Sequence, residues 1–382
     1  MIPSPPGSRT LAGVPDVRSR PSLSLPTKRA IVVGAGSFGT AVAVLLARGG
    51  FRTTLQTRTA EQARTLLDDR ENRTYLPGVE LPKELRIENV EAGLGRADYV
   101  FLGVPSTGVG QTIAGLTKAG LTGRTAVISL AKGLTPPHGL APTVLLRERF
   151  GEGRVACIGG PSHAREMVSE GAGLVAASTN EDLARALAGV FIRAGVVCEQ
   201  SNDPIGVELA GAAKNAAGLA AGATEAQGLN AAGAAAGHIF AEVWRYADAQ
   251  GARPESLVGL AGTGDLVATV LAPQSRNRRA GELLAAGVPA AEIPRRIGQA
   301  VESLESVPLL ARALNHAGLE APVTDGLAKL ISGELPLGDW VALVRTTVPP
   351  TPTRWRRVAP GFWPRTIARG RGVLGRAEPP SA

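Results

Sequence analysis

The feature that most constrains the fold of this chain is a glycine-rich loop near its N-terminus, with the sequence GAGSFG at residues 34–39. A short apolar run precedes the loop, and a helical segment follows it. In this context the G-x-G-x-x-G pattern is typical of a dinucleotide-binding turn. Gly34 allows the tight turn, Gly36 lets the backbone approach a pyrophosphate, and Gly39 allows the helix to pack closely on the strand. The helix N-terminus offers its N–H groups to the anion.

The second predicted strand, residues 52–58, bears on which dinucleotide binds. An acidic residue at the end of this strand would bind the ribose 2′-hydroxyl of NAD. Here Gln56 is followed by Arg58, whose guanidinium either pairs with the 2′-phosphate of NADP or lies exposed on the surface. The sequence therefore leaves both NAD(H) and NADP(H) open as the cofactor.

Two patterns divide the rest of the chain. Between residues 29 and 203, short β-branched runs alternate with helical stretches, which predicts a mostly parallel sheet with helices on both faces. Beyond this segment strand-like runs largely vanish, and Ala-rich helical stretches take over. Asp203-Pro204 has the pattern of an N-cap followed by proline at the first helical position. We therefore predict an α/β fold with a dinucleotide-binding domain at 29–203 and an all-α domain at 204–345.

The net charge of +8 is concentrated at the two ends of the chain. Residues 1–29 carry +4 and residues 346–382 carry +6, so the middle is close to neutral. This distribution argues against nucleic acid as a partner, even though the isoelectric point is near 10. Both ends are rich in Pro and Arg, and we predict disordered basic tails at 1–28 and 346–382.

The sequence supports neither a membrane protein nor a metalloprotein. The longest stretch of low charge, residues 209–243, has small side chains and is interrupted by charged residues, so we expect no membrane insertion and a cytoplasmic protein. The two cysteines and four histidines lack the spacing of metal ligands, so we expect no metal.

Several polar residues stand out in the Ala/Gly-rich sequence. Lys132 follows a predicted strand, at the carboxyl edge where α/β sheets bind ligands. Lys214 lies in an Ala-rich helix and either extends to solvent or sits in a site with a depressed pKa, suited to a general base. Asp265 is either an acidic site residue or a helix cap. Arg276 and Asn277 either grip a phosphate or belong to a solvated basic turn.

Together these motifs resemble those of the soluble bacterial NAD(P)-dependent glycerol-3-phosphate dehydrogenases, over about residues 29–345. They occur in the family's order, as GAGSFGTA, YLPGVELP, VPS, AKG, GPSHAREM, GVELAGAAKNAAGLAAG, GLAGTGDLVAT, SRNRRAGELL and AVES. The resemblance implies a Rossmann-like domain followed by an all-α domain. It also implies interconversion of sn-glycerol 3-phosphate and dihydroxyacetone phosphate by hydride transfer to or from NAD(P), supplying glycerol 3-phosphate for phospholipid synthesis.

The resemblance further implies a role for each site residue. Lys214 would accept the proton of the C2 hydroxyl. The substrate positions would be Lys132, Gly160, Ser162, Lys214, Asp265, Ser275, Arg276 and Asn277. The cofactor positions would be Gly34, Gly36, Ser37, Phe38, Gly39, Arg58, Lys132, Ala164, Arg276, Ala300 and Glu302. A homodimer is compatible with this interpretation.

Two alternatives keep the same fold. One is a related dehydrogenase that acts on another small phosphorylated hydroxy substrate. The other is a catalytically weak NAD(P)-binding protein that senses the redox state of the cofactor. Departures from the family pattern around Ala232 and His238 motivate the second alternative.

Overall fold

The computed structural model describes residues 28–121 and 123–348. The two predicted tails therefore lie outside the described residues, apart from Lys28 and residues 346–348. Within the described part of the chain, no single helix has the length and apolar character to cross a membrane. One bent pair, Pro254–Leu271 with Arg276–Ala285, has the length and composition of a broken span.

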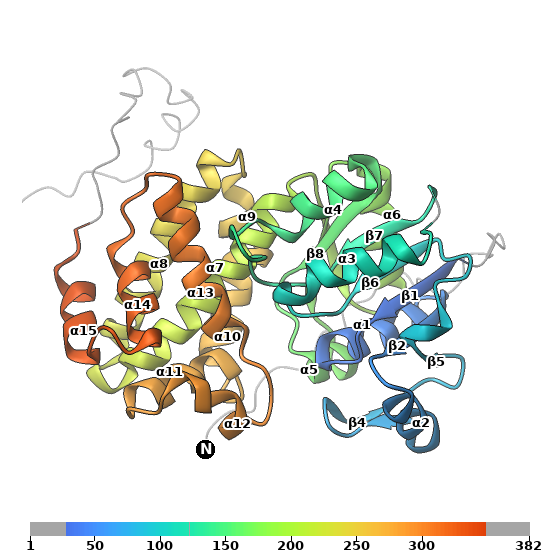
Figure 1. The fold of residues 1–382 in the computed structure, drawn as a ribbon, viewed down its shortest axis with the longest axis horizontal. Coiled ribbons are helices and arrows are strands. Elements are labelled where there is room, and N and C mark those ends of the chain that lie inside the picture. Colours follow the sequence, from blue (N-terminus) through green and yellow to red (C-terminus); the bar gives the residue numbers. More distant parts are fainter. Residues whose placement is uncertain (1–27, 122, 349–382) are drawn as a thin grey trace, which may run out of the picture. The chain divides into compact units, whose positions relative to one another are not determined.

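The first half of the chain forms a sheet that has eight strands within the described residues, in the order β10-β9-β8-β7-β6-β1-β2-β5 (Figure 1). The strands are β1 (Arg29–Val33), β2 (Arg52–Thr57), β5 (Arg86–Asn89), β6 (Tyr99–Leu102), β7 (Ala126–Ser129), β8 (Val155–Gly159), β9 (Gly173–Ala177) and β10 (Val197–Ser201). Neighbouring strands run parallel, except that β8 and β9 are antiparallel. The predicted mostly parallel sheet is confirmed. The local signal is weakest for β5 (RIEN) and β9 (GLVAA), each of which has one β-branched residue.

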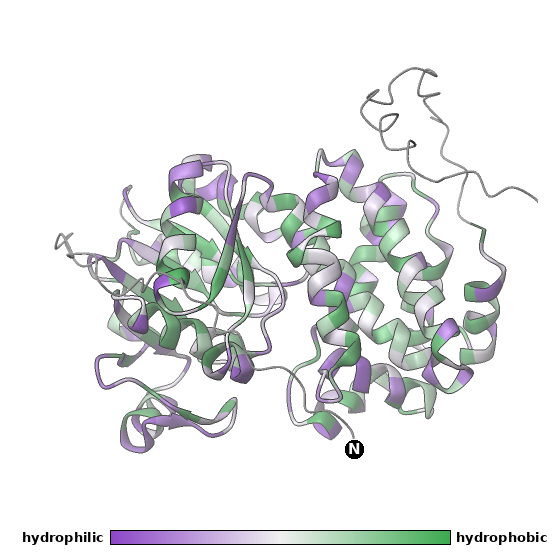
Figure 2. Ribbon diagram, turned by 180° about the vertical axis from the view of Figure 1, so that it is seen from behind, coloured by the Kyte–Doolittle hydropathy of each residue, from purple (hydrophilic) through white to green (hydrophobic). Residues whose placement is uncertain are grey.

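Helices cover both faces of this sheet because side chains along its strands alternate in direction. Val32 of β1 packs in one apolar cluster with α1 (Ser37–Arg48) and α6 (Glu181–Arg193). Its neighbour Ile31 packs in another cluster with α3 (Val109–Lys118) and α4 (Pro142–Phe150). Figure 2 shows the apolar residues along the strands. The remaining elements of this half are α2 (Ala60–Asp69), α5 (Ala164–Ser169) and a separate hairpin of β3 (Glu71–Asn72) and β4 (Leu76–Glu80).

The second half of the chain is helical and is organised around α7 (Pro204–Thr224). Its Ala and Gly residues are small and almost all buried, which allows other helices to approach closely. Those that pack on α7 are α8 (Leu229–Ala249), α9 (Pro254–Val258), α10 (Asp265–Leu271), α11 (Arg276–Ala285) and α13 (Glu302–His316). The others are α12 (Ile293–Ile297), α14 (Pro322–Ser332) and α15 (Leu337–Thr346). The short 3₁₀ or π turns are η1 (Val90–Ala92), η2 (Ser106–Gly108), η3 (Glu152–Arg154), η4 (Glu225–Gln227), η5 (Leu260–Gly264) and η6 (Ala290–Glu292).

A buried carboxylate ties α7 to the sheet half. The oxygens of Glu208 accept hydrogen bonds from the backbone N–H of Thr143, at 3.0 and 3.2 Å, and from its hydroxyl at 2.5 Å. Thr143 lies in the first turn of α4, so Glu208 satisfies an N–H group that the helix itself leaves free. Burial raises the pKa of Glu208 to about 7. Glu242 of α8 caps α14 in the same way, through Thr324.

Candidate active site

A cleft of about 2250 Å³ is lined by residues that follow β1, β2, β6, β7 and β8 and by residues of the helical half. Fifteen of the predicted site residues line it, namely Gly34, Gly36, Ser37, Phe38, Gly39, Arg58, Lys132, Ser162, Ala164, Lys214, Ser275, Arg276, Asn277, Ala300 and Glu302. The other two, Gly160 and Asp265, contact Lys132 directly. The fold therefore brings all the predicted site residues to one region.

Within the cleft, the glycine-rich loop has two glycines at which a side chain would not fit. Gly34 has a φ of 110°, and a Cβ there would lie 2.4 Å from the carbonyl oxygen of Gly103. A Cβ on Gly39 would lie 2.1 Å from the carbonyl oxygen of Gly34. A Cβ on Gly36 would meet no atom of the described chain within 4 Å. Beside Gly36, at the N-terminus of α1, the loop thus leaves open space that fits a dinucleotide pyrophosphate.

Beyond this loop, the end of β2 reaches the same cleft. Gln56 is buried, and its side-chain amide donates to the carbonyl oxygen of Gly93 at 2.7 Å. Arg58 is exposed and lines the cleft, so both interpretations of this arginine agree with its position. Its guanidinium is accessible to a cofactor phosphate.

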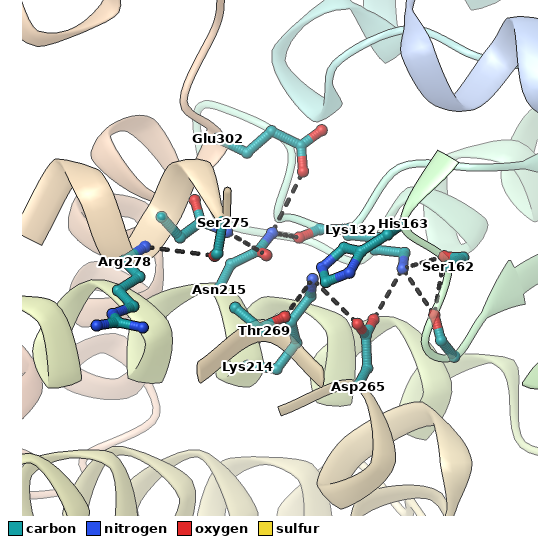
Figure 3. Close-up of polar contacts among 12 residues, drawn as sticks. Lys132, Ser162, His163, Lys214, Asn215, Asp265, Thr269, Ser275, Arg278 and Glu302 are labelled. Carbon is teal, nitrogen blue, oxygen red and sulfur yellow. Dashed lines mark hydrogen bonds and ion pairs between the residues drawn. The ribbon is translucent and has the colours of Figure 1, made fainter. Parts of the chain in front are cut away.

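Near the glycine-rich loop, the Nζ of Lys132 contacts three oxygen atoms (Figure 3). It follows β7, as predicted, and its Nζ donates to the carbonyl oxygen of Gly160 at 2.8 Å and to the hydroxyl of Ser162 at 2.7 Å. It also pairs with Oδ2 of Asp265 at 2.8 Å. The ring centroid of Phe38 lies 5.2 Å from the same Nζ, so the glycine-rich loop and the lysine share one site.

Lys214 lies in the middle of α7 and is 7% exposed, so the interpretation in which it extends to solvent is wrong. Its Nζ lies 3.3 Å from Oδ1 of Asp265 and donates to the hydroxyl of Thr269 at 3.2 Å. Burial lowers the pKa of Lys214, and the attraction of Asp265 offsets this only in part. The charge of Lys132 lowers it further. A lysine held in this way can give up its proton more readily than an exposed one.

Asp265 is the group that the two lysines share. It is the first residue of α10, but the N-cap position belongs to Gly264, and no side-chain cap bond forms there among the described residues. The interpretation of Asp265 as a helix cap is therefore wrong. Burial by itself would raise its pKa, but Lys132 and Lys214 together bring the pKa below its ordinary value. The carboxylate stays ionised between two ammonium groups.

A chain of side-chain amides connects this cluster to α11 and α13. Asn215 donates from Nδ2 to the carbonyl oxygen of Lys132 at 2.7 Å and to Glu302 at 3.2 Å. Asn277 donates in turn to Oδ1 of Asn215 at 2.7 Å. Predicted residues from separate helices are thus linked through Asn215, which was not among the predicted site residues.

The N-terminus of α11 opens into the cleft and is suited to an anion. Ser275 is its N-cap and accepts from the backbone N–H of Arg278 at 3.4 Å. Arg276 is exposed and donates to the carbonyl oxygen of Ala300 at 3.0 Å. Arg278 is instead paired with Glu225. Free N–H groups and a cation at a helix start favour a bound phosphate.

Thr269 and Asn215 are the polar contacts that sequence reasoning missed. A sequence signal was present for Thr269 alone. Thr269 lies four residues after Asp265, a spacing that puts two side chains on the same face of a helix. Asn215 directly follows Lys214, but neighbours in sequence point in different directions on a helix, and only its amide contacts show its place in the site.

A parallel sheet with a dinucleotide turn after its first strand, joined to a helical half that supplies a buried lysine, defines a dehydrogenase of the nicotinamide-dependent class. Comparison with family models identifies the member of this class. Residues 29–184 match the model described as NAD-dependent glycerol-3-phosphate dehydrogenase N-terminus, and residues 203–342 match the C-terminus model. The chain belongs to the NAD-dependent glycerol-3-phosphate dehydrogenase family, which confirms the predicted resemblance.

Individual relatives agree with this assignment. The chain is 37% identical over 310 residues to a glycerol-3-phosphate dehydrogenase [NAD(P)+] of Deinococcus radiodurans, covering 79% of this chain and 90% of the relative. It is 37% identical over 318 residues to one of Moorella thermoacetica, covering 81% and 93%. The crystal structure of glycerol-3-phosphate dehydrogenase from Coxiella burnetii superimposes with a TM-score of 0.80 at 28% identity, covering 84% of this chain and 99% of that one.

Proposed function

We propose that this protein interconverts sn-glycerol 3-phosphate and dihydroxyacetone phosphate, with NAD(P) as the hydride acceptor or donor. The observation that carries the proposal is the cluster of Lys132 with the buried Lys214 and Asp265, which shares a cleft with the dinucleotide turn. The names of the relatives support the substrate. The alternative of a related phosphorylated substrate uses the same site and is decided by the assay below.

In this proposal Lys214 is the general base. A bound nicotinamide supplies the hydride acceptor or donor at the reacting carbon. Lys214, in its neutral form, takes the proton from the C2 hydroxyl as the C2–H bond breaks and the carbonyl forms. In the reverse direction, its ammonium form gives that proton to the carbonyl oxygen. Asp265 stabilises the ammonium form, and the lowered pKa of Lys214 keeps the neutral form accessible.

The phosphate of the substrate is proposed to bind at the start of α11. Arg276 and Asn277 line the cleft there, and the first N–H groups of the helix add a positive dipole end. Lys132 and Ser162 are proposed to hold the hydroxyl groups of the substrate near Lys214. The remaining predicted residues are proposed to bind the cofactor, with Ser37 and Phe38 at the pyrophosphate turn and Ala164, Ala300 and Glu302 further along the cleft.

Four finer points belong to the same proposal. We propose a boundary between the dinucleotide-binding and helical domains at Asp203 and Pro204, which is supported by the start of α7 at Pro204. NADP(H) is proposed to bind better than NAD(H), which is supported by the position of Arg58. A cytoplasmic homodimer is proposed, and sedimentation of the purified protein tests its dimeric state. The supply of glycerol 3-phosphate to phospholipid synthesis stays a prediction that rests on the family resemblance.

The test is a reduction assay on the purified full chain. Dihydroxyacetone phosphate is offered with NADH and with NADPH in parallel, and loss of the reduced cofactor is followed by its absorbance. We expect turnover with dihydroxyacetone phosphate and none with dihydroxyacetone, which lacks the phosphate. Turnover only with a different phosphorylated ketone would favour the related-dehydrogenase alternative. Tight cofactor binding without turnover on any of these would favour the sensor.

A further inference from the structure

Asn72 connects the glycine-rich loop to a part of the chain that the mechanism does not use. It lies in β3, in the small hairpin outside the main sheet, and is only 2% exposed. Its Nδ2 donates to the carbonyl oxygen of Ala35 at 3.0 Å and to the hydroxyl of Thr40 at 2.8 Å. Its Oδ1 accepts from the backbone N–H of Tyr75 at 3.3 Å. One buried side-chain amide thus joins the loop, the first turns of α1 and the hairpin turn.

These contacts fix the orientation of one peptide group in the loop. The Ala35 carbonyl belongs to the peptide whose N–H is that of Gly36. In a trans peptide the C=O and N–H point in opposite directions. A carbonyl that is held by Asn72 therefore turns the Gly36 N–H away from Asn72. Gly36 is the residue beside which the chain leaves open space for the pyrophosphate.

The second acceptor of Asn72, the hydroxyl of Thr40, lies in the first turn of α1. The backbone N–H of Thr40 donates to the carbonyl oxygen of Gly36 at 2.9 Å, and its side chain is fully buried. Asn72 therefore holds the loop from both sides of Gly36, through Ala35 before it and Thr40 after it. A side-chain amide suits this position because it carries two N–H donors for the two oxygen acceptors. A carboxylate of the same shape would face the Ala35 carbonyl without a proton to share.

We propose that Asn72 is a positioning residue for the cofactor, which holds the glycine-rich loop in the conformation that binds the dinucleotide before the dinucleotide arrives. The inference rests on the cofactor site of the proposed function. It assigns to the small hairpin a role in cofactor affinity and none in the chemical step, because Asn72 has no contact with Lys132, Lys214 or Asp265 among the described hydrogen bonds.

The test compares Asn72→Asp with the parent enzyme by direct titration of NADH and NADPH. We expect the dissociation constants of both cofactors to rise roughly 5- to 50-fold, because a loop without its buried donors is no longer held in place. At saturating cofactor, kcat should stay within about threefold of the parent, and the KM of dihydroxyacetone phosphate should change little. Unchanged dissociation constants, or a loss confined to kcat, would overturn the proposal.

A matched control lies in the same hairpin. Glu71 accepts from the backbone N–H of Gly78 at 2.7 Å, so Glu71→Ala weakens the hairpin without touching the loop. Its cofactor affinities should stay within about twofold of the parent. If Glu71→Ala weakened binding as much as Asn72→Asp, general loosening of the hairpin would explain both, and the proposal would fail.

Two other outcomes are interpreted separately: a variant that does not fold, and a parent that binds the cofactor without turnover. If Asn72→Asp does not fold, Thr40→Val decides, since it removes one acceptor of Asn72 and keeps the shape of the side chain. Roughly two- to fivefold weaker cofactor binding is then expected, and parental affinity would overturn the proposal. A parent that binds NAD(P)H but does not reduce dihydroxyacetone phosphate contradicts the proposed substrate alone, because the titrations do not depend on turnover.

Discussion

Two regions of the cleft, the glycine-rich loop and the cluster around Lys132, are built in opposite ways. At the dinucleotide turn, the site is made largely of backbone from consecutive residues, 34–39, and a Cβ at Gly34 or Gly39 would collide with the chain. In the cluster, the site is made of side chains from separate segments, and Lys132 and Asp265 are 133 positions apart. The loop depends on the absence of side chains at its glycines. The cluster depends on keeping each charge beside its partner.

This difference teaches where each kind of substitution does harm. A backbone site tolerates changes in chemistry around it but not added volume. A side-chain site tolerates changes in volume better than the loss of one charge, because the remaining charges stay buried without compensation. The predictions that follow test the contrast, beginning with the largest expected effect.

Replacing the base is expected to cost the most. Lys214→Ala should lower kcat by roughly 10³- to 10⁴-fold, since it removes the group proposed to move the proton. Lys214→Arg is the matched control, because it keeps a cation that cannot lose its proton near neutral pH, and it should be similarly inactive. Steady-state rates with saturating dihydroxyacetone phosphate provide the measurement. Substantial activity in the Arg variant would show that charge, and not proton transfer, is what the site needs.

Adding one methyl group at Gly34 or at Gly36 tests the stability of the fold and the affinity for the cofactor separately. Gly34→Ala forces a Cβ against the Gly103 carbonyl at a positive φ and should destabilise the fold by about 1–3 kcal/mol. Gly36→Ala meets no atom of the described chain within 4 Å, so its unfolding free energy should change by less than ~1 kcal/mol. Its affinity for NAD(P)H should nevertheless fall, by roughly tenfold. Denaturant unfolding and cofactor titration of both variants measure this, and parental affinity in Gly36→Ala would contradict a cofactor at that position.

The hydrogen bonds between Glu208 of α7 and Thr143 of α4 should make the free energy of unfolding depend on pH. The pKa of Glu208 is about 7 in the folded protein, above its ordinary 4.5. The unfolded chain therefore loses this proton first, and the contribution of Glu208 to stability is present at low pH and lost as pH rises from about 4.5 to about 7. The loss amounts to about 3 kcal/mol. In Glu208→Gln this part of the dependence should be absent.

Unfolding free energies at pH 5 and pH 8 measure the difference between the parent and Glu208→Gln. The same fall in stability between these two pH values in both proteins would show that Glu208 does not titrate in this range. Protonation of Glu208 would then not contribute to holding α7, the helix that bears Lys214, in place.

The smallest expected effect concerns the choice of cofactor. Arg58→Ala should weaken NADPH binding by about fivefold, because an exposed guanidinium that faces a phosphate contributes about 1 kcal/mol. NADH binding should change by less than twofold, since NADH lacks that phosphate. Titration with both cofactors measures the ratio. Equal losses for both would place Arg58 away from the 2′-phosphate and leave the cofactor preference without its support.

Much of the fold followed from local pattern, and the failures have physical reasons. The strand, glycine turn and helix at residues 30–48 are contiguous, so the local sequence is enough to predict their geometry. The local signal is weak for β9 because burial between neighbours, more than its own β propensity, makes it a strand. Thr269 and Asn215 escaped because their importance lies in contacts with residues far away in the chain.

The sequence by itself determined the dinucleotide turn, the change from an α/β pattern to a helical one near residue 204, and most of the polar residues that the fold brings to one cleft. These depend on neighbours in the chain and on residue type. Only the tertiary structure decided that Lys214 is buried, that Asp265 pairs with two lysines instead of capping its helix, and that Asn72 holds the glycine-rich loop. Those facts depend on desolvation and on distances between segments, which arise only when the chain has packed.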